Sequence, residues 1–165
     1  MFRILYIAVI AVLIALDRVS KIAAVKALGA GETKEFLFGL FQFRYVENTG
    51  AAFSSFADNK IVLIVFTSLV ILLCLFMLMA EKVKSKFIRV CLLMIVSGGI
   101  GNLIDRFAGG YVVDFIEPLF MNFAVFNVAD MFITVGAFML IFYEIYLLVK
   151  EKRQGGKTGK DDKKD

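Results

Sequence analysis

Histidine is absent from the 165 residues of this chain, which has a single proline and only two cysteines. Without histidine, catalytic triads and metal sites that depend on an imidazole are excluded. Cys74 and Cys91 both lie inside apolar runs and not in a paired spacing, so neither a disulfide framework nor a cysteine zinc cluster is expected. Hydrolytic chemistry in this chain would therefore depend on a water activated by carboxylates.

What the chain has in excess is apolar side chains. Hydrophobic residues make up 60% of the sequence, including 18 phenylalanines, whereas ordinary soluble domains are roughly 45 to 50% apolar. The formal net charge is +4, but the basic residues gather beside the apolar runs and form no stripe of the kind that binds nucleic acid. The sequence therefore predicts an integral membrane protein with no nucleic-acid partner.

Four apolar runs predict an all-α architecture of four transmembrane helices. Residues 61–80 are 20 consecutive uncharged residues, which is long enough to cross a bilayer. The runs at residues 90–104 and 131–143 reach spanning length only with their apolar flanks. The first run, residues 4–16, is interrupted by Asp17 before it resumes. A cleavable signal peptide is the alternative for this run, but the charges that follow leave no clean cleavage site.

Lysine and arginine residues in the short loops predict the orientation of these helices. They are concentrated near the amino terminus, after the second run and in residues 151–165, so both termini are expected on the cytoplasmic side. Residues 28–60 and 105–127 then face outward. We expect residues 1–150 to form one membrane domain and residues 151–165 to be a disordered basic tail, because the end of the tail is rich in Lys, Gly and Asp.

The first outward segment contains a β-forming stretch. Residues 35–46 are rich in phenylalanine and other β-formers, with Gly39 in the middle. This pattern predicts a small strand or hairpin on the outer membrane surface. Residues 48–53, which follow it, are typical of a turn leading into a small-residue segment.

A polar line ends the third apolar run. Asn102, Asp105 and Arg106 share one helix face, because residues three and four apart lie on the same side of a helix. An amide, a carboxylate and a guanidinium in this position must face a bundle interior or a water-filled cleft. The glycines just before them, including Gly98 and Gly101, favour close helix packing.

A second polar stripe begins the fourth run at Asn127, Asp130 and Thr134. Asn127 could simply cap the helix, which would not prevent it from also orienting Asp130. Asp114 lies shortly before, in a loop whose flanking apolar residues indicate contact with the membrane interface, although an exposed loop carboxylate is the simpler interpretation. Two carboxylates beside hydrocarbon can share one proton and act as acid and base, which is the equipment of an aspartic hydrolase.

Asp17 and Lys21 are four residues apart in the first run. The simplest interpretation is an ion pair within one helix, and contact with a lipid headgroup is the alternative.

Five segments, in this order, resemble the sequence boxes of the bacterial lipoprotein signal peptidases, also called signal peptidase II. The resemblance covers the chain from Asp17 to about Thr134. The segments are Asp17 with Ser20 and Lys21, Asn48-Thr49-Gly50-Ala51-Ala52-Phe53, Gly98-Gly99 with Gly101-Asn102-Leu103-Ile104-Asp105-Arg106, Val112-Val113-Asp114-Phe115, and Phe126-Asn127-Val128-Ala129-Asp130.

The resemblance implies an endopeptidase of the bacterial cytoplasmic membrane, active at its outer face, that cleaves diacylglyceryl-modified prolipoproteins before the lipidated cysteine. It implies no metal or cofactor, prolipoproteins and membrane phospholipid as partners, and the cyclic peptide globomycin as an inhibitor. It places Asp114 and Asp130 as the catalytic dyad. The residues that it places in the substrate pocket are Asn48, Asn102, Arg106 and Asn127. The supporting positions that we expect are Asp17, Lys21, Gly50, Gly98, Gly101, Asp105 and Ala129.

Three other functions are alternatives to this one. In a small transporter or channel, Asp105, Asp114 and Asp130 would bind protons or cations, but transport sites lie near mid-membrane and these carboxylates gather at one edge. The intramembrane proteases of the presenilin type carry Gly-x-Gly-Asp and Tyr-Asp motifs that are absent here. A noncatalytic scaffold would tolerate aspartate-to-asparagine changes.

Overall fold

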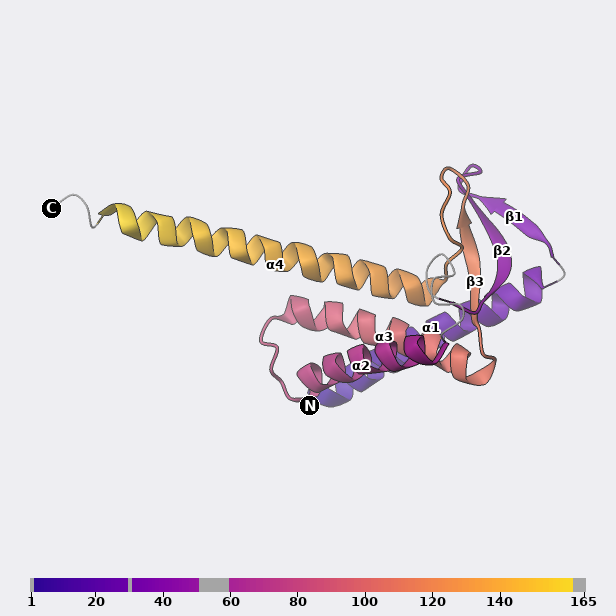
Figure 1. Ribbon diagram of the computed structural model, residues 1–165, viewed down its shortest axis with the longest axis horizontal. Coiled ribbons are helices and arrows are strands. Elements are labelled where there is room, and N and C mark those ends of the chain that lie inside the picture. Colours follow the sequence, from indigo (N-terminus) through magenta and orange to yellow (C-terminus); the bar gives the residue numbers. More distant parts are fainter. Residues whose placement is uncertain (1, 30, 51–59, 162–165) are drawn as a thin grey trace.

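The computed structural model describes residues 2–29, 31–50 and 60–161. Four helices run roughly side by side, and a small sheet crosses them at one end (Figure 1). The helices are α1 (Phe2–Leu28), α2 (Lys60–Met79), α3 (Lys86–Ala108) and α4 (Val128–Asp161). The strands are β1 (Thr33–Phe36), β2 (Phe41–Asn48) and β3 (Val112–Pro118).

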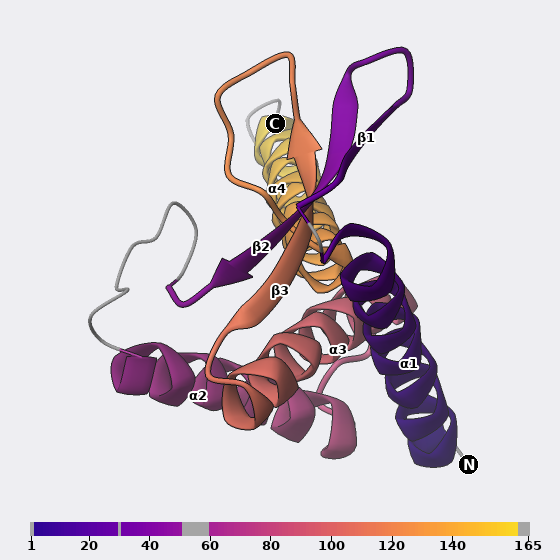
Figure 2. The same ribbon diagram turned by 90° about the vertical axis from the view of Figure 1, so that its right-hand side faces the viewer.

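α3 is the central helix, and it packs against α1, α2 and α4 (Figure 2). Its glycines make this approach possible. A Cβ atom at Gly98 would lie 2.3 Å from the carbonyl oxygen of Ala129 on α4, and one at Gly99 would lie 2.8 Å from Ile71 on α2. These distances are too short for a side chain, so the glycines serve the close helix packing that their spacing predicts.

Within residues 2–29, 31–50 and 60–161, three helices are long and apolar enough to cross a membrane: α2 at Ile61–Met79, α3 at Lys86–Ala108 and α4 at Val128–Arg153. Large apolar side chains such as Leu69 and Phe138 point away from the other helices. The coarse prediction of a helical membrane protein is thus confirmed. α1 is similar in length, but the charged residues near Asp17 keep it outside this group.

The sheet has the order β1-β2-β3, with both pairings antiparallel. The predicted hairpin in residues 35–46 is present as β1 and β2. The segment around Asp114 differs from the prediction, since it is strand β3 and not a loop. Its β-branched residues pair with β2, and Asp114 lies opposite Val46 just beyond an irregularity in the register.

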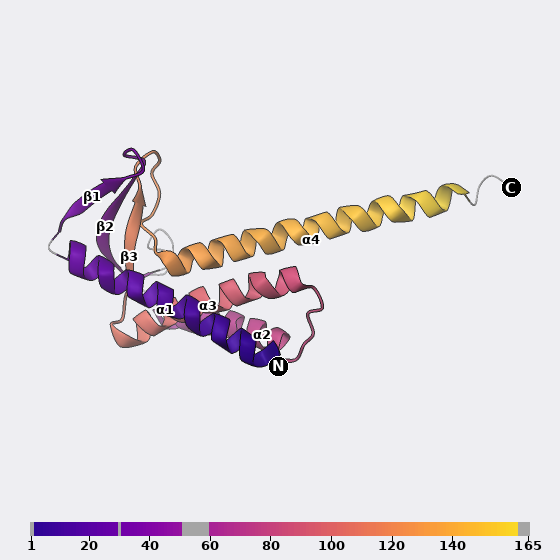
Figure 3. The ribbon, with the colours of Figure 1, turned by 180° about the vertical axis from the view of Figure 1, so that it is seen from behind.

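The carboxyl-terminal segment also differs from the prediction. Residues 151–161, which were expected to be disordered, continue α4 as a helix. The sequence from residue 150 to 154 is rich in Lys, Glu, Arg and Gln, which are good helix formers, and no proline interrupts it. α1 begins and α4 ends at the end of the bundle away from the sheet (Figure 3).

Candidate active site

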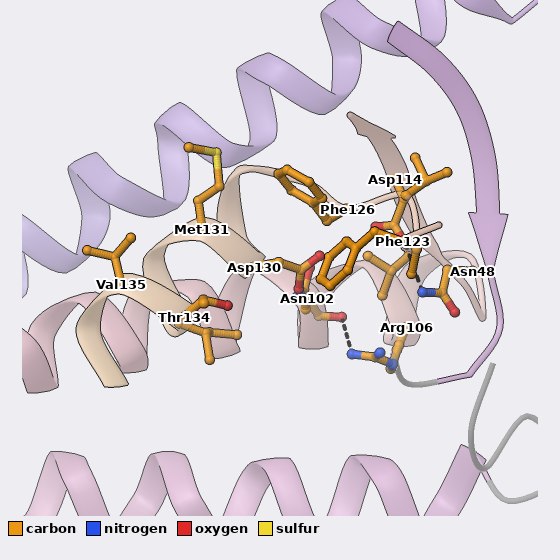
Figure 4. Close-up of a pocket in the computed structure, with 14 residues that line it drawn as sticks. Asn48, Asn102, Arg106, Asp114, Phe123, Phe126, Asp130, Met131, Thr134 and Val135 are labelled. Carbon is orange, nitrogen blue, oxygen red and sulfur yellow. Dashed lines mark hydrogen bonds between the residues drawn. The ribbon is translucent and has the colours of Figure 1, made fainter. Parts of the chain in front are cut away.

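A pocket of about 390 Å³ opens where the start of α4 meets α3, the end of β2 and the start of β3. Its volume lies in the range of roughly 300 to 1,000 Å³ that is typical of ligand sites. Figure 4 shows side chains from all four elements around it. The polar lining residues are Asn48, Asn102, Arg106, Asp114, Asp130 and Thr134, and the apolar ones are Val112, Phe123, Ala124, Val125, Phe126, Met131, Ile133 and Val135.

Asp114 reaches this pocket from β3 and is 1% exposed. Its Oδ2 accepts a hydrogen bond from Asn48 Nδ2 at 2.8 Å, and its Oδ1 accepts one from Asn127 Nδ2 at 2.6 Å. Burial, and next the negative charge of Asp130, raise the pKa of Asp114 to about 6. This carboxyl can therefore exchange a proton near neutral pH.

Asp130 lies in the first turn of α4. Its Oδ1 accepts a hydrogen bond from Asn102 Nδ2 at 2.7 Å, and its Oδ2 accepts one from the backbone N–H of Asn127 at 3.2 Å. The Asn127 Oδ1 accepts in return from the backbone N–H of Asp130 at 2.9 Å. This reciprocal pair is a helix-capping arrangement. Asn127 thus caps the helix and orients Asp130, so the two interpretations of this residue hold together.

Asn127 connects the two aspartates. It is fully buried, and its Nδ2 lies 2.6 Å from Asp114 Oδ1 and 3.2 Å from Asn102 Oδ1. The same residue holds Asp130 through its backbone and its side-chain oxygen. One side chain therefore brings β3, α3 and α4 to a common point, and both carboxylates face the same pocket.

Arg106 supplies a positive charge to the pocket. Its Nη2 donates to the carbonyl oxygen of Gly50 at 3.0 Å, and its Nη1 donates to that of Asn102 at 3.4 Å. Its Nε is buried and has no hydrogen-bond partner among the described residues. Gly50 is itself held by a hydrogen bond from its N–H to Asn48 Oδ1 at 3.0 Å. The rest of the second segment, residues 51–53, lies outside the described part of the chain.

A buried cluster of charges lies behind the pocket, between α1 and α3. Lys21 is 2% exposed, and its Nζ lies 2.8 Å from Asp17 Oδ2, 2.8 Å from Asp105 Oδ2 and 2.9 Å from Asn102 Oδ1. Arg18 pairs with the other oxygen of Asp105. The ion pair of Asp17 and Lys21 is therefore present, and both side chains are buried among protein groups, which leaves no room for a lipid headgroup between them.

The charge cluster also fixes the start of α4. Asp17 Oδ1 accepts a hydrogen bond from the backbone N–H of Ala129 at 3.0 Å. Gly101 makes room for this contact, because a Cβ atom there would lie 2.6 Å from Asp17 Oδ2 and 3.5 Å from Ala129 Cβ. Five of the predicted supporting residues therefore lie in or against this charge cluster, namely Asp17, Lys21, Gly101, Asp105 and Ala129, whereas Gly50 contacts Asn48 and Arg106 at the pocket.

The sequence did not predict the role of Arg18 in the charge cluster or the apolar wall of the pocket. Arg18 was recognised only as a charge in an apolar run, and nothing local shows that its partner is Asp105. For the apolar wall that includes Phe123 and Met131, the sequence contains one indication, because no charged residue occurs from residue 118 to 129. That absence of charge in an outward segment could have indicated a lipid-facing wall.

The family model for signal peptidase II matches residues 9–146. This chain belongs to the signal peptidase II family. It is 41% identical over 137 residues to a lipoprotein signal peptidase of Streptococcus pyogenes serotype M2 (strain MGAS10270), covering 83% of this chain and 90% of the relative. It is 43% identical over 135 residues to a lipoprotein signal peptidase of Clostridium tetani (strain Massachusetts / E88), covering 80% of this chain and 86% of the relative. The resemblance seen in the sequence is confirmed.

Two solved structures, both of bacterial membrane enzymes obtained by the in meso method, share the fold. The structure at 2.3 Å resolution has a TM-score of 0.78 and 24% sequence identity, covering 86% of this chain and 87% of the other. The structure at 1.9 Å resolution has a TM-score of 0.74 and 24% identity, covering 84% and 90%. As a signal peptidase II, the chain is an aspartic peptidase, and its activity belongs among the hydrolases.

Proposed function

We propose that Asp114 and Asp130 form the catalytic dyad of an endopeptidase that removes the signal peptide from diacylglyceryl-modified prolipoproteins, cleaving before the lipidated cysteine. The observation that carries this proposal is the convergence of both carboxylates on one pocket through Asn127. Carboxylates that share a site also share a proton, which supplies an acid and a base at once.

In the proposed reaction, ionised Asp130 takes a proton from a water whose oxygen attacks the scissile carbonyl carbon. Protonated Asp114 gives its proton to the carbonyl oxygen. When the C–N bond breaks, Asp130 protonates the leaving amine and Asp114 takes back a proton from the tetrahedral intermediate. Asp114 is assigned the starting proton because burial and the charge of Asp130 raise its pKa to about 6. The pair titrates as one coupled unit.

The pocket residues suit an extended peptide next to lipid. Asn48, Asn102 and Asn127 can orient the dyad and the substrate backbone, and the Nε–H of Arg106, which has no partner in the described part of the chain, can donate to a carbonyl oxygen or an oxyanion. The wall that includes Met131 and Val135 is apolar and partly exposed. This wall can accept the acyl chains of the substrate, and we expect the pocket to accept globomycin as well.

We propose that α1 is the fourth membrane span. Asp17 and Lys21, two of the charged residues that interrupt its apolar run, do not face lipid, because both are buried against α3. Both chain termini, which lie at the end of the bundle away from the sheet, would then be cytoplasmic. The sheet and the pocket would lie at the outer face of the bacterial inner membrane. The basic residues at the sheet-free end, such as Lys82 and Lys84, support this orientation.

The experiment is cleavage of a synthetic prolipoprotein peptide by purified protein in detergent, with the diacylglyceryl-modified and the unmodified cysteine compared side by side. We expect cleavage before the modified cysteine only, with no loss of rate in a strong chelator. Equal cleavage of the unmodified peptide would refute the proposed substrate class. Loss of cleavage on chelation would refute a reaction that depends on the two carboxylates.

A further inference from the structure

One end of the sheet carries a group of large apolar side chains that the peptidase reaction does not use. The turn between β1 and β2 contributes Leu37, Phe38 and Leu40, and the loop after β3 contributes Leu119, Phe120 and Met121. All six side chains are exposed, and Phe38 is fully so. We call these six residues the sheet tip. The two loops are joined by a hydrogen bond from the N–H of Leu119 to the carbonyl oxygen of Leu40 at 2.8 Å.

The backbone of this turn makes the exposed side chains more unusual. Leu37, Phe38 and Gly39 have φ angles of 49°, 60° and 78°, so three successive residues are left-handed. Asn, Asp and Gly adopt this conformation most easily, and they are the usual residues of such hairpin turns. Bulky apolar residues are disfavoured here twice, by the backbone conformation and by exposure to water. Exposed bulky apolar residues in a left-handed turn therefore indicate a contact with something outside the chain.

The position of the tip identifies that contact. β3 starts next to the end of α3 and runs across the helices, so its far end at Pro118 lies away from α1 and α3 (Figures 1 and 3). The tip projects on the same side of the bundle as α4, beyond the start of that helix (Figure 1). α4 itself presents exposed apolar residues such as Phe138 and Phe142 on its surface. The tip and the exposed apolar surface of α4 therefore lie on the same side of the bundle.

The charge distribution fits insertion to a limited depth. No charged residue occurs from residue 36 to 41 or from residue 118 to 129. Directly behind the tip, Gln42 lies opposite Glu117, and Arg44 Nε lies 3.1 Å from Glu117 Oε2. An apolar end followed by a charged band is the pattern of an element that lies in the membrane interface, since the charges remain at the level of the headgroups.

We propose that the sheet tip is a membrane anchor that inserts into the acyl chains of the outer leaflet. The anchor would hold the sheet level with the bilayer surface. Because Asn48 ends β2 and Asp114 lies on β3, the anchor would also keep these residues at the depth where a lipidated substrate enters the pocket. The occupant is the bilayer, and a second copy of the chain or the substrate itself would give different results below.

The chain has no tryptophan, so Phe38→Trp introduces the only one, and its emission can be excited apart from that of the tyrosines. In vesicles, we expect blue-shifted emission and quenching by lipids brominated on the acyl chain. Lys34→Trp on β1, level with the charged band because Lys34 lies opposite Phe43, is the matched control and should be quenched much less. Water-like, unquenched emission from Phe38→Trp would overturn the proposal. Emission that changes with the protein-to-lipid ratio, at constant quencher fraction, would indicate a second copy and would overturn it too.

A second measurement tests the consequence for substrate entry, and this part rests on the proposed peptidase function. Phe38→Ser should lower kcat/KM for a lipidated substrate in vesicles by roughly threefold to tenfold, because the sheet is no longer held at its depth. The same variant should match the wild type in detergent micelles. An equal loss in micelles would contradict an anchor and would indicate direct contact with the substrate. The fluorescence result needs no activity, so failure of the peptidase proposal and failure of the anchor are distinguishable.

Discussion

Two groups of aspartates lie within one helical bundle and differ in the partners that hold them. Asp17 and Asp105 each lie 2.8 Å from the ammonium of Lys21. The hydrogen bonds found for Asp114 and Asp130 in the described residues come from amide groups. An ammonium neutralises a carboxylate, whereas an amide orients it and leaves its charge in place. The first group can therefore hold the fold together, and the second keeps the unbalanced charge that proton transfer needs.

Replacing either member of the second group should have the largest effect. Asp114→Asn or Asp130→Asn should lower kcat by about a thousandfold or more, because an amide can neither take nor give the proton. The double variant should be scarcely slower than either single one, since the two residues act as a unit. Cleavage rates of all three variants in detergent check this, and losses that multiply would contradict a shared proton.

Replacing the cation of the first group should damage stability. Lys21→Met leaves Asp17 and Asp105 buried without their common partner, which we expect to cost about 3 to 5 kcal/mol. Thermal unfolding in detergent measures this effect. Lys26→Met, on the exposed surface of the same helix, is the control and should change Tm very little. A Lys21→Met protein as stable as the wild type would show that the charge cluster does not support the fold.

A smaller loss of stability is expected at the contact between α3, which carries Asp105, and α4, which carries Asp130. Gly98→Ala would place a Cβ atom 2.3 Å from the carbonyl oxygen of Ala129. α3 and α4 must then separate, at a cost of roughly 1 to 3 kcal/mol. In Gly109→Ala the nearest contact would be a Tyr111 side-chain atom at 3.4 Å, so this variant should unfold close to the wild-type temperature. Equal Tm values for the two variants would argue against close packing at Gly98.

The smallest effect concerns the pH dependence. Asn48 Nδ2 donates to Asp114 and so favours its ionised form, while burial and Asp130 raise the pKa of Asp114 to about 6. Asn48→Ala should raise this pKa further. If Asp114 is the acid, the alkaline limb of kcat/KM should move to higher pH by about half a unit. A shift to lower pH would mean that Asn48 does not act on this carboxyl as a donor to its ionised form.

The features that the sequence predicts are those that depend on local pattern. Uncharged runs predict the membrane helices, and spacings of three and four place Asn102 with Arg106 and Asn127 with Asp130. The hairpin in residues 35–46 follows from its β-formers and Gly39. The strand at Asp114 was predicted as a loop, although Val112 and Val113 carry the β signal, because its pairing with β2 depends on a partner far away in the sequence.

Contacts between distant segments could not be predicted from the sequence. Nothing local indicates that Lys21 meets Asp105 and Asn102, or that Asp17 holds the backbone of Ala129. The continuation of α4 beyond residue 150 was missed for a different reason. The composition of the tail suggested disorder, but the helix formers that follow residue 149 extend a helix that has already begun.

The most direct test of the central claim is one set of four amide variants, Asp17→Asn, Asp105→Asn, Asp114→Asn and Asp130→Asn, each measured for Tm and for turnover per folded molecule. We predict that the first two lower Tm and keep turnover within about tenfold of the wild type, because their partners are cations. The last two should keep Tm within a few degrees and lose turnover. Substantial turnover by Asp114→Asn or Asp130→Asn would contradict the assignment of the dyad. So would a result in which turnover is abolished only in Asp17→Asn and Asp105→Asn although these two variants are folded.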